Sequence, residues 1–303
     1  LIQGNVPARG LQMETRARQV LHNHVAQTLK LAAEVRAGKQ PRPDLVLWPE
    51  NASDVDPFRD YTGYAEIQKA VRAIGAPVLV GAILQGPGNH RRNAGILWSP
   101  TSGPGAQYIK RHPVPFAEYI PMRSIAEWVS PAAKLVKHDM IGGHGNGLLR
   151  GGPVPIGDVI CFEVAYDGLV HSSVAAGAQL LVVQTNNATF GTTSETFQQL
   201  AMSRLRAVET GRVVLQVSTT GESAVIAPNG DVRQNSGALF HPAILTADVA
   251  PLTGMTLAVR LGPIPEYVLA ALALAALVAT TVPLRRRREQ QAPESAPEAL
   301  VHS

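Results

Sequence analysis

Three polar residues stand at the ends of apolar segments and could together carry out acyl transfer. Glu50, Lys110 and Cys161 each follow a short apolar run of the kind that forms a buried strand. We therefore expect the three side chains at the rim of a hydrophobic core. A thiol nucleophile, a carboxylate that takes its proton and a cation that stabilises an oxyanion are the groups that reaction through a thioester requires.

Each of these residues alone has a more ordinary interpretation. Most glutamates are exposed to solvent, and an isolated cysteine is more often an inert core residue than a reactive one. Lys110 is followed by Arg111 and His112, as in a solvated basic corner. The combination of the three residues favours catalysis. Cys161 is expected at a strand-to-helix turn, where a helix N-terminus favours the thiolate.

The composition excludes several other kinds of site. Cys161 is the single cysteine, which excludes an internal disulfide framework and a zinc site built from several thiolates. The nine histidines show no paired metal-ligand spacing, so we expect no metal and no cofactor. The net charge of +4 over 303 residues comes partly from the arginines at 285–288. The chain therefore lacks the basic face of a nucleic-acid-binding protein.

The elements that must position these residues follow an α/β pattern. Helices are predicted over 14–36 and 195–209, and the second carries Phe197, Leu205 and Val208 on one apolar face. Short apolar segments bounded by Gly, Pro or Asn predict strands at 44–48, 77–84, 94–99, 107–110, 157–162, 179–184, 213–218, 223–227 and 244–249, with a hairpin turn at 228–231. This mixture of elements favours an α/β sandwich with a mixed sheet.

The chain is expected to divide into a globular domain, a membrane anchor and a tail. We predict the globular domain over 1–260, a transmembrane helix over 264–284, and a basic and then disordered cytoplasmic tail over 285–303. The run 267–284 carries no charge, is just long enough to cross a bilayer, and precedes four arginines of the kind that mark a cytoplasmic flank. A buried core helix is the alternative interpretation of this run.

The segments that carry the polar residues resemble the nitrilase, or carbon-nitrogen hydrolase, superfamily. Its Glu-Lys-Cys signatures are similar to WPE (48–50), KRHPVPF (110–116) and ICFE (160–163). More narrowly, bacterial apolipoprotein N-acyltransferases are similar to this chain in QGNVP (3–7), PFAEYIP (115–121), TNNATFG (185–191), the helix 198–209 and the apolar run that ends at 284. The resemblance covers nearly the whole chain up to that point.

The resemblance implies a nitrilase-like αββα sandwich followed by the transmembrane helix. By motif match, Cys161 is the nucleophile, Glu50 the general base and Lys110 the group that stabilises the oxyanion. Glu118 and Glu163 match further acidic positions of the family's active site. These roles are expectations that come from the resemblance.

The narrower resemblance implies the transfer of an acyl chain through a cysteine thioester. A phospholipid would be the acyl donor, and the N-terminal amine of a diacylglyceryl-cysteine lipoprotein would be the acceptor. The expected location is the cytoplasmic membrane of a bacterium, with the catalytic domain on the extracytoplasmic face. The apolar stretch 113–129 is expected either as a lid that dips into the lipid interface or as a packed surface loop.

The sequence departs from the family pattern at three points. A block of membrane helices precedes the nitrilase domain in the family, whereas this chain begins at Leu1 without one. We expect that membrane segment to be made separately or to be missing from this chain. Phe162 stands where a tyrosine commonly follows the nucleophile, which removes one hydroxyl from the site. Ala117 replaces the glycine that is usual before Glu118.

Two other functions stay open at this point. A nitrilase-type amidohydrolase would pass the acyl group to water, and a product that depends on an amine would separate it from an acyltransferase. A non-catalytic membrane-anchored module would form no acyl adduct on Cys161. The presence of Glu50, Lys110 and Cys161 in one chain argues against such a module.

Overall fold

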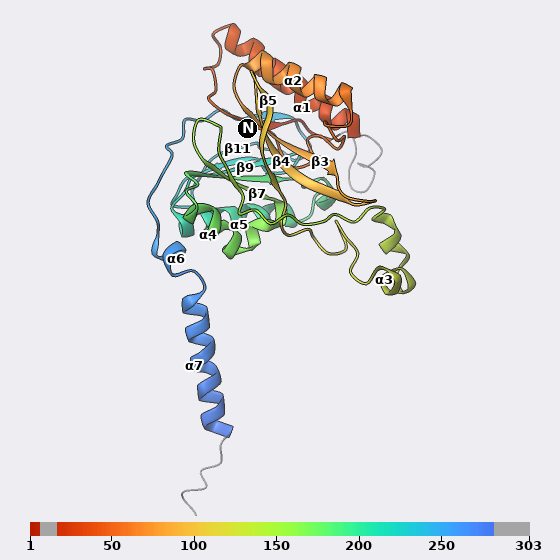
Figure 1. Ribbon diagram of the computed structural model, residues 1–303. Helices are drawn as coiled ribbons and strands as arrows, with labels where there is room; N and C mark the ends of the chain where they lie inside the picture. The colour runs from red at the N-terminus through yellow and green to blue at the C-terminus, as the bar shows by residue number, and fades with distance from the viewer. Residues whose placement is uncertain (7–16, 282–303) are drawn as a thin grey trace, which may run out of the picture. The chain divides into compact units, whose positions relative to one another are not determined.

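Two β-sheets lie face to face in residues 1–260, and helices cover the outer face of each sheet (Figure 1). This architecture comes from a computed structural model, which describes residues 1–6 and 17–281. The chain divides into two units, Leu1–Arg260 and a second unit that begins at Leu261. The predicted α/β sandwich is therefore confirmed.

The first sheet has four strands, and two helices cover it. In spatial order the strands are β2 (Val46–Leu47), β3 (Val78–Gln85), β4 (Arg91–Ser99) and β5 (Gly103–Ile109). β2 and β3 run parallel, whereas β3, β4 and β5 form an antiparallel meander. The covering helices are α1 (Ala17–Arg36) and α2 (Tyr61–Ile74). Helix α2 begins where the Asp60 carboxylate accepts a hydrogen bond from the backbone N–H of Gly63.

The second sheet is mixed, as the sequence predicts. In spatial order its strands are β11 (Val232–Asn235), β10 (Ala224–Ile226), β9 (Val214–Ser218), β8 (Leu180–Thr185), β7 (Ile156–Ile160) and β6 (Leu148–Leu149). The central strands β7, β8 and β9 run parallel, and the outer strands are antiparallel to their neighbours. Helices α4 (Asp167–Ala175) and α5 (Glu195–Thr210) cover this sheet. The hairpin predicted at 228–231 joins β10 to β11.

The remaining elements of residues 1–260 are short. They are β1 (Ile2–Gln3), which pairs with β12 (Ala243–Ile244), the helices α3 (Arg123–Val129) and α6 (Leu257–Leu261), and the 3₁₀ helices η2 (Pro131–Leu135), η3 (Cys161–Ala165) and η4 (Ala188–Phe190). The strand predicted over 244–249 is wrong beyond Ile244, because β1 offers only two residues with which to pair.

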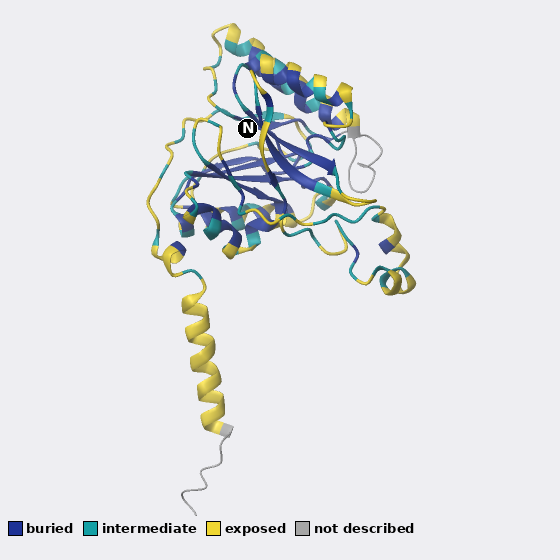
Figure 2. Ribbon diagram, in the orientation of Figure 1, coloured by how far each residue is buried: buried dark blue, intermediate teal, exposed yellow. Residues whose placement is uncertain are grey.

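Apolar side chains form three layers between these elements. The layer between the two sheets joins Leu47 and Leu79 of the first sheet to Ile160 and Val182 of the second. A second layer packs α1 and α2 on the first sheet, and a third packs α4 and α5 on the other. Figure 2 shows the strands buried and the helices exposed on their outward sides. Each strand end that carries a candidate residue is therefore held by packing on both faces of its sheet.

Helix α5 buries a polar face, which contradicts the orientation that its sequence predicts. Phe197, Leu205 and Val208, the residues of its apolar face, are each more than half exposed. Its buried residues are mostly polar, namely Thr196, Gln199, Ser203, Arg206, Ala207 and Thr210. The physical reason is that the strands beneath α5 carry buried polar groups that need partners: the Ser203 hydroxyl donates to Gln216 Oε1 at 2.7 Å.

The second unit contains helix α7 (Ile264–Thr281). Within the described residues, no helix combines the length and the apolar character needed to cross a membrane. The transmembrane helix predicted over 264–284 is thus not supported, and its last residues, 282–284, lie outside the described part of the chain. Glu266 occupies the first turn of α7. The tail predicted over 285–303 also lies outside the described residues.

Candidate active site

Cys161 lies at a tight turn directly after strand β7. The strand ends at Ile160, and the 3₁₀ helix η3 begins at Cys161, whose φ is 57°. A residue other than glycine pays about 1–2 kcal/mol for this left-handed conformation, so the surrounding structure must hold it. Part of that support comes from the Glu163 carboxylate, which accepts a hydrogen bond from the backbone N–H of Ile160 at 3.0 Å. The turn presents the thiol at the end of the sheet, where it is 9% exposed.

Glu50 lies just beyond strand β2, in a turn that the neighbouring strand approaches closely. A Cβ atom on Gly81 of β3 would lie 2.1 Å from the carbonyl oxygen of Pro49, which no side chain could tolerate. Glycine is therefore required at position 81 for β3 to pack against the turn that carries Glu50. The Glu50 side chain itself is buried.

The Glu50 carboxylate is hydrogen bonded on both oxygens. Its Oε1 accepts from Asn93 Nδ2 at 2.7 Å and from Lys110 Nζ at 3.0 Å. Its Oε2 accepts from the backbone N–H of Asn186 at 2.9 Å. These donors come from β4, the end of β5 and the loop after β8, so both sheets orient one carboxylate. A carboxylate held in this way is preorganised for proton transfer.

Lys110 lies at the end of β5 and is almost fully buried between two carboxylates. Its Nζ is 3.0 Å from Glu50 Oε1 and 2.8 Å from Glu118 Oε2. Glu118 is held in turn by the backbone N–H of Val114 at 2.7 Å and by Asn93 Nδ2 at 3.1 Å. An ammonium group has three N–H donors. Two of them are used here, which leaves one that can point toward a reacting oxygen.

Glu163 connects the ends of strands β5 and β7 by hydrogen bonds. Its Oε1 accepts from the backbone N–H groups of Arg111 and His112 at 2.6 and 3.0 Å, and from the hydroxyl of Tyr108 at 2.9 Å. Because Glu163 also belongs to η3, it fixes the position of the turn carrying Cys161 relative to the residues that follow Lys110. This geometry gives Glu163 a positioning role.

Burial and mutual charge shift the pKa values of the cluster. Burial, followed by the Glu50 charge, raises the pKa of the Cys161 thiol to about 12, although Lys110 opposes the shift. Burial also raises the pKa of Glu50. For Lys110, burial would lower the pKa, but the negative charges of Glu50 and Glu118 raise it. The resting site therefore holds a thiol and an ammonium group.

The expectation of a thiolate favoured by a helix N-terminus is wrong for this resting structure. Cys161 begins a 3₁₀ helix of only five residues, in which few peptide dipoles can act on the sulfur. Burial and the negative charge of Glu50 dominate instead. The Cys161 thiol is in hydrogen-bond contact with the Glu50 carboxylate.

Two residues of the cluster were missed by sequence reasoning. Asn93 donates to both Glu50 and Glu118, and Gln199 Nε2 lies 3.7 Å from Cys161 Sγ. Asn93 immediately precedes the apolar run that was predicted as a strand, and a polar residue at that place was the available signal. For Gln199 the signal was hidden, because α5 was expected to bury its apolar face. Among the described residues, no group of His, Cys, Asp and Glu side chains could hold a metal ion.

A profile of one protein family matches most of the chain. The carbon-nitrogen hydrolase profile covers residues 8–253, which include Glu50, Lys110 and Cys161. The match therefore covers both sheets and the whole buried cluster.

Several curated proteins are similar in sequence over most of the chain. The apolipoprotein N-acyltransferase of Mycolicibacterium smegmatis is 41% identical over 91% of this chain and 47% of its own length. That of Azotobacter vinelandii is 31% identical over 84% of this chain and 49% of its own. The chain thus spans about half the length of the curated relatives it matches.

A solved structure shows the same fold. The amidase from Nesterenkonia sp. AN1, in a structure with acrylamide added at its active-site cysteine, aligns with a TM-score of 0.58. The alignment covers 88% of this chain and 96% of the amidase at 18% identity, which supports the fold alone. The predicted nitrilase-like sandwich is thereby confirmed. Because the profile covers most of the chain, the chain belongs to the carbon-nitrogen hydrolase family.

Proposed function

We propose that this chain is the catalytic part of an apolipoprotein N-acyltransferase. It would move an acyl chain from a phospholipid to the N-terminal amine of a diacylglyceryl-cysteine lipoprotein, through a thioester on Cys161. The observation that carries the proposal is the position of Cys161 in one buried cluster with Glu50 and Lys110. The names of the two curated relatives described above support the choice of acyl transfer over other reactions of the family.

In the first half-reaction, Cys161 takes the acyl group. Glu50 accepts the thiol proton while the sulfur attacks the ester carbonyl carbon, so that a C–S bond forms and the carbonyl oxygen becomes an oxyanion. The remaining N–H of Lys110 stabilises that oxyanion, and one such donor contributes roughly 3 kcal/mol in comparable sites. The oxyanion then collapses and the ester C–O bond breaks. The leaving oxygen takes the proton from Glu50 and departs in the lysophospholipid.

In the second half-reaction, an amine accepts the acyl group. The N-terminal amine of the lipoprotein attacks the thioester carbon, and Glu50 takes a proton from the attacking nitrogen. A C–N bond forms, the C–S bond breaks, and the sulfur of Cys161 recovers its proton from Glu50. The sequence of two substrates and one covalent intermediate predicts ping-pong kinetics.

The paired carboxylates explain how Lys110 can remain charged in a buried site. An isolated buried ammonium group would lose its proton, but Lys110 has ion pairs with Glu50 and Glu118. When Glu50 is protonated during the reaction, Glu118 still neutralises the cation. We propose that Glu118 keeps Lys110 charged and in place at the moment when the oxyanion forms.

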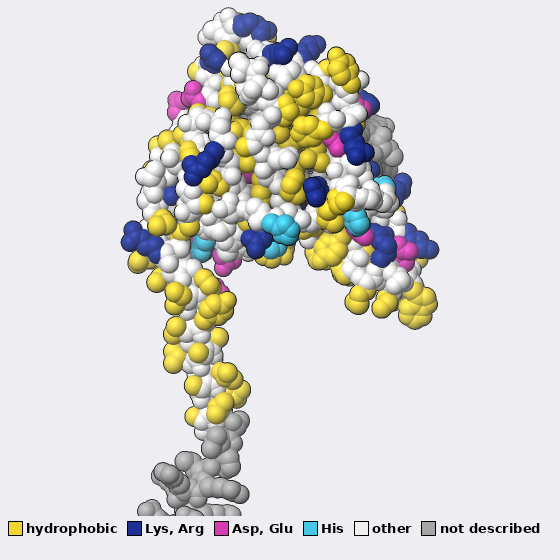
Figure 3. Space-filling view, in the orientation of Figure 1, with side chains coloured by type: hydrophobic (Ala, Val, Ile, Leu, Met, Phe, Trp, Pro, Cys, Tyr) yellow, Lys and Arg dark blue, Asp and Glu magenta, His cyan; other side chains and the backbone are white. Residues whose placement is uncertain are grey.

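Apolar side chains around α3 support a lipid substrate. Met122, Ile125, Trp128 and Val129 are all exposed, with Trp128 at 86%, and Figure 3 shows hydrophobic side chains gathered over this part of the molecule. The predicted lid over 113–129 is therefore favoured over a packed loop for its second half. An exposed apolar and aromatic group of this kind suits a membrane interface. The membrane anchor, the bacterial cytoplasmic membrane and the extracytoplasmic orientation stay predictions from the sequence.

Intact-protein mass spectrometry tests the proposal. The chain, purified in detergent, is incubated with a phospholipid of defined acyl chains, beside Cys161→Ser as the matched control. We expect the wild type alone to gain the mass of one acyl chain, and hydroxylamine to remove it. Addition of a synthetic diacylglyceryl-cysteine peptide should discharge the adduct and give the N-acylated peptide.

Other outcomes would identify the alternatives. Discharge of the thioester at the same rate with and without the peptide amine, with free fatty acid as the product, would indicate a hydrolase. If no adduct forms although a small alkylating reagent still modifies Cys161, the thiol is accessible and the acyltransferase proposal fails. A non-catalytic module would then be the better interpretation.

A further inference from the structure

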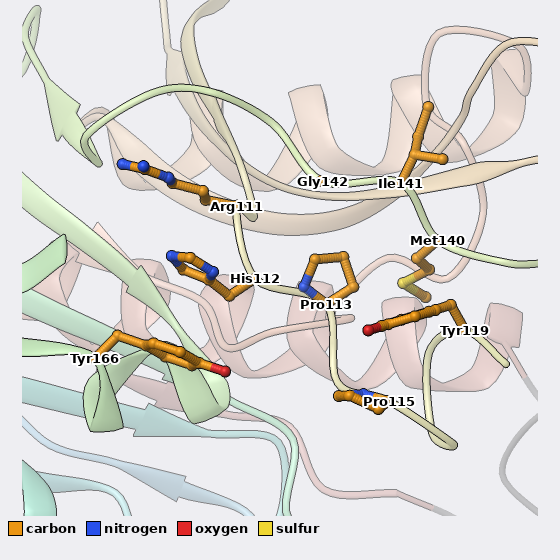
Figure 4. Close-up of a pocket in the computed structure, with 9 residues that line it drawn as sticks. All are labelled: Arg111, His112, Pro113, Pro115, Tyr119, Met140, Ile141, Gly142 and Tyr166. Carbon is orange, nitrogen blue, oxygen red and sulfur yellow. The ribbon is translucent and has the colours of Figure 1, made fainter. Parts of the chain in front are cut away.

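A hollow opens beside the turn that carries Cys161, and its lining changes in character from one end to the other. It has a volume of about 440 Å³, within the usual size of small-molecule sites. Arg111, His112 and Tyr166 lie at one end (Figure 4), and Pro113, Pro115 and Met140 contribute to an apolar wall at the other. The hollow thus suits a molecule that has a charged part joined to an apolar part.

Arg111 supplies the charge of this hollow. No Asp or Glu belongs to the lining, and within the described chain the Arg111 guanidinium makes neither an ion pair nor a hydrogen bond; its only hydrogen bonds come from its backbone N–H. Burial and then the Arg111 charge lower the pKa of His112, so its ring is mostly neutral near pH 7. A guanidinium without a carboxylate partner is a binding group for an anion.

An aromatic stack forms the floor next to Arg111. The rings of His112 and Tyr166 lie parallel, with centroids 4.3 Å apart and an interplanar angle of 9°, as Figure 4 shows. The ring of Phe162 packs edge-on against Tyr166, with centroids 6.1 Å apart. The stacked rings of His112 and Tyr166 thus join the loop after Lys110 to the residue that follows η3.

The hollow is tied directly to the reacting residues. Arg111 and His112 follow Lys110 in the chain, and Tyr166 follows the last residue of η3, which begins with Cys161. The hydrogen bonds of Glu163 to the backbone of Arg111 and His112 fix one side relative to the other. The hollow therefore lies next to the segments that carry Lys110 and Cys161.

We infer that Arg111 binds the phosphodiester of the acyl donor while the apolar wall contacts its glycerol and the start of its acyl chains. The inference rests on the proposed function and adds a recognition site for the donor headgroup. In a glycerophospholipid only the glycerol backbone separates the reacting ester from the phosphate. Arg111 can bond two phosphate oxygens at once through its planar fork, which lysine cannot do.

Two donors that differ only in the phosphate test the inference. Acylation of Cys161 by a phospholipid and by a diacylglycerol with the same chains is followed in non-ionic detergent by intact mass. We expect Arg111→Gln to lower the ratio of the phospholipid rate to the diacylglycerol rate roughly tenfold. Arg111→Lys should lower the ratio less, because the charge is kept and the fork is lost. Lys134→Gln, which removes an exposed cation outside the hollow, should leave the ratio unchanged.

A binding measurement tests Arg111 independently of the chemistry. A diether phospholipid has no ester to react, and its affinity for Cys161→Ala can be measured by calorimetry in the same detergent. Arg111→Gln in that background should weaken binding roughly tenfold, whereas Lys134→Gln should not. If the acylation proposal is wrong, this binding measurement still tests the contact between Arg111 and the phosphate.

Three results would overturn the inference. Equal loss of both donor rates in Arg111→Gln would indicate a general structural effect. Unchanged affinity of Arg111→Gln for the diether lipid would show that the guanidinium does not contact the phosphate. If inorganic phosphate bound the hollow as strongly as the diether phospholipid does, the hollow would be a general anion site that does not recognise the lipid. A wild type that is acylated by neither donor would instead count against the proposed function.

Discussion

The ammonium group of Lys110 lies 2.8 Å from Glu118 Oε2, at least as close as its 3.0 Å contact with Glu50. One buried cation is thus shared by Glu50, which we propose as the base, and by a second carboxylate, that of Glu118. Asn93 donates to both carboxylates and holds them at this spacing. With Cys161, the cluster therefore contains five side chains, of which we propose the thiol as the reacting member.

Glu118→Gln should slow thioester formation while the fold is kept. The amide cannot neutralise Lys110 when Glu50 takes the thiol proton, and loss of one charge-assisted contact predicts a fall of about tenfold to a hundredfold. The measurement is the rate of the acyl mass shift, with thermal unfolding as the check on folding. Glu127→Gln, which removes the carboxylate of a half-buried ion pair with Arg123 outside the cluster, is the matched control. A wild-type rate in Glu118→Gln would contradict the role given to Glu118.

Glu50→Gln should make Cys161 easier to alkylate, although it abolishes acyl transfer. The Glu50 charge and its hydrogen bond raise the pKa of the thiol, so their loss lowers that pKa. Each unit of decrease raises the thiolate fraction about tenfold. Iodoacetamide labelling between pH 7 and 10, followed by intact mass, measures the effect. In the wild type the rate should rise over this whole interval without a plateau, because the thiol pKa is about 12. Slower labelling in Glu50→Gln would contradict this account.

Asp158→Asn should stabilise the protein at neutral and alkaline pH. Both Asp158 oxygens are buried without a hydrogen-bond partner among the described residues, and burial, then the Glu163 and Glu50 charges, raise the pKa of Asp158. The native state keeps a proton that the unfolded state releases, so the free energy of unfolding falls as pH rises above about 4, by roughly 1.4 kcal/mol per pH unit. The slope ends at the native pKa.

Chemical denaturation between pH 4 and 8 checks this prediction, because the asparagine variant lacks the slope that Asp158 causes. Asp139→Asn provides a control of opposite sign. A hydrogen bond from Arg123 lowers the pKa of Asp139, so that carboxylate stabilises the fold above its unfolded pKa, and the contribution is lost as pH falls. A stability profile of Asp158→Asn that runs parallel to the wild type would show that Asp158 is ionised in the native state.

On helix α5, substitution of an apolar residue should cost less unfolding free energy than substitution of a polar one, which is the reverse of the usual order. Leu205→Ser replaces an exposed leucine and should change the free energy of unfolding by less than about 0.5 kcal/mol. Ser203→Val leaves Gln216 Oε1 without the hydroxyl that now donates to it, which should cost about 1–3 kcal/mol. Urea denaturation of both variants gives the comparison. A larger loss for Leu205→Ser would mean that its face is covered in solution.

Much of the sandwich could be predicted from local pattern. The apolar runs that predict strands correspond to β3, β4, β7, β8 and β9, because buried strands need such residues whatever their partners are. The short strands β1 and β6 were missed, since two residues carry no periodicity. Helix α5 was predicted, but the face that it buries was predicted wrongly. The apolar pattern of the helix contains no information about the polar groups of the sheet beneath it.

The sequence by itself determined the family, the strand ends and the chemical types of the candidate site. Glu50, Lys110, Glu118, Cys161 and Glu163 were all named from motifs, and the structure places them in one region. Only the tertiary structure decided what each of them contacts: Glu118 bonds Lys110, Glu163 bonds the backbone at both strand ends, and burial with the Glu50 charge raises the pKa of the thiol. The physical reason is that pKa values and hydrogen bonds depend on burial and on neighbours from distant segments, which spacing along the chain does not specify.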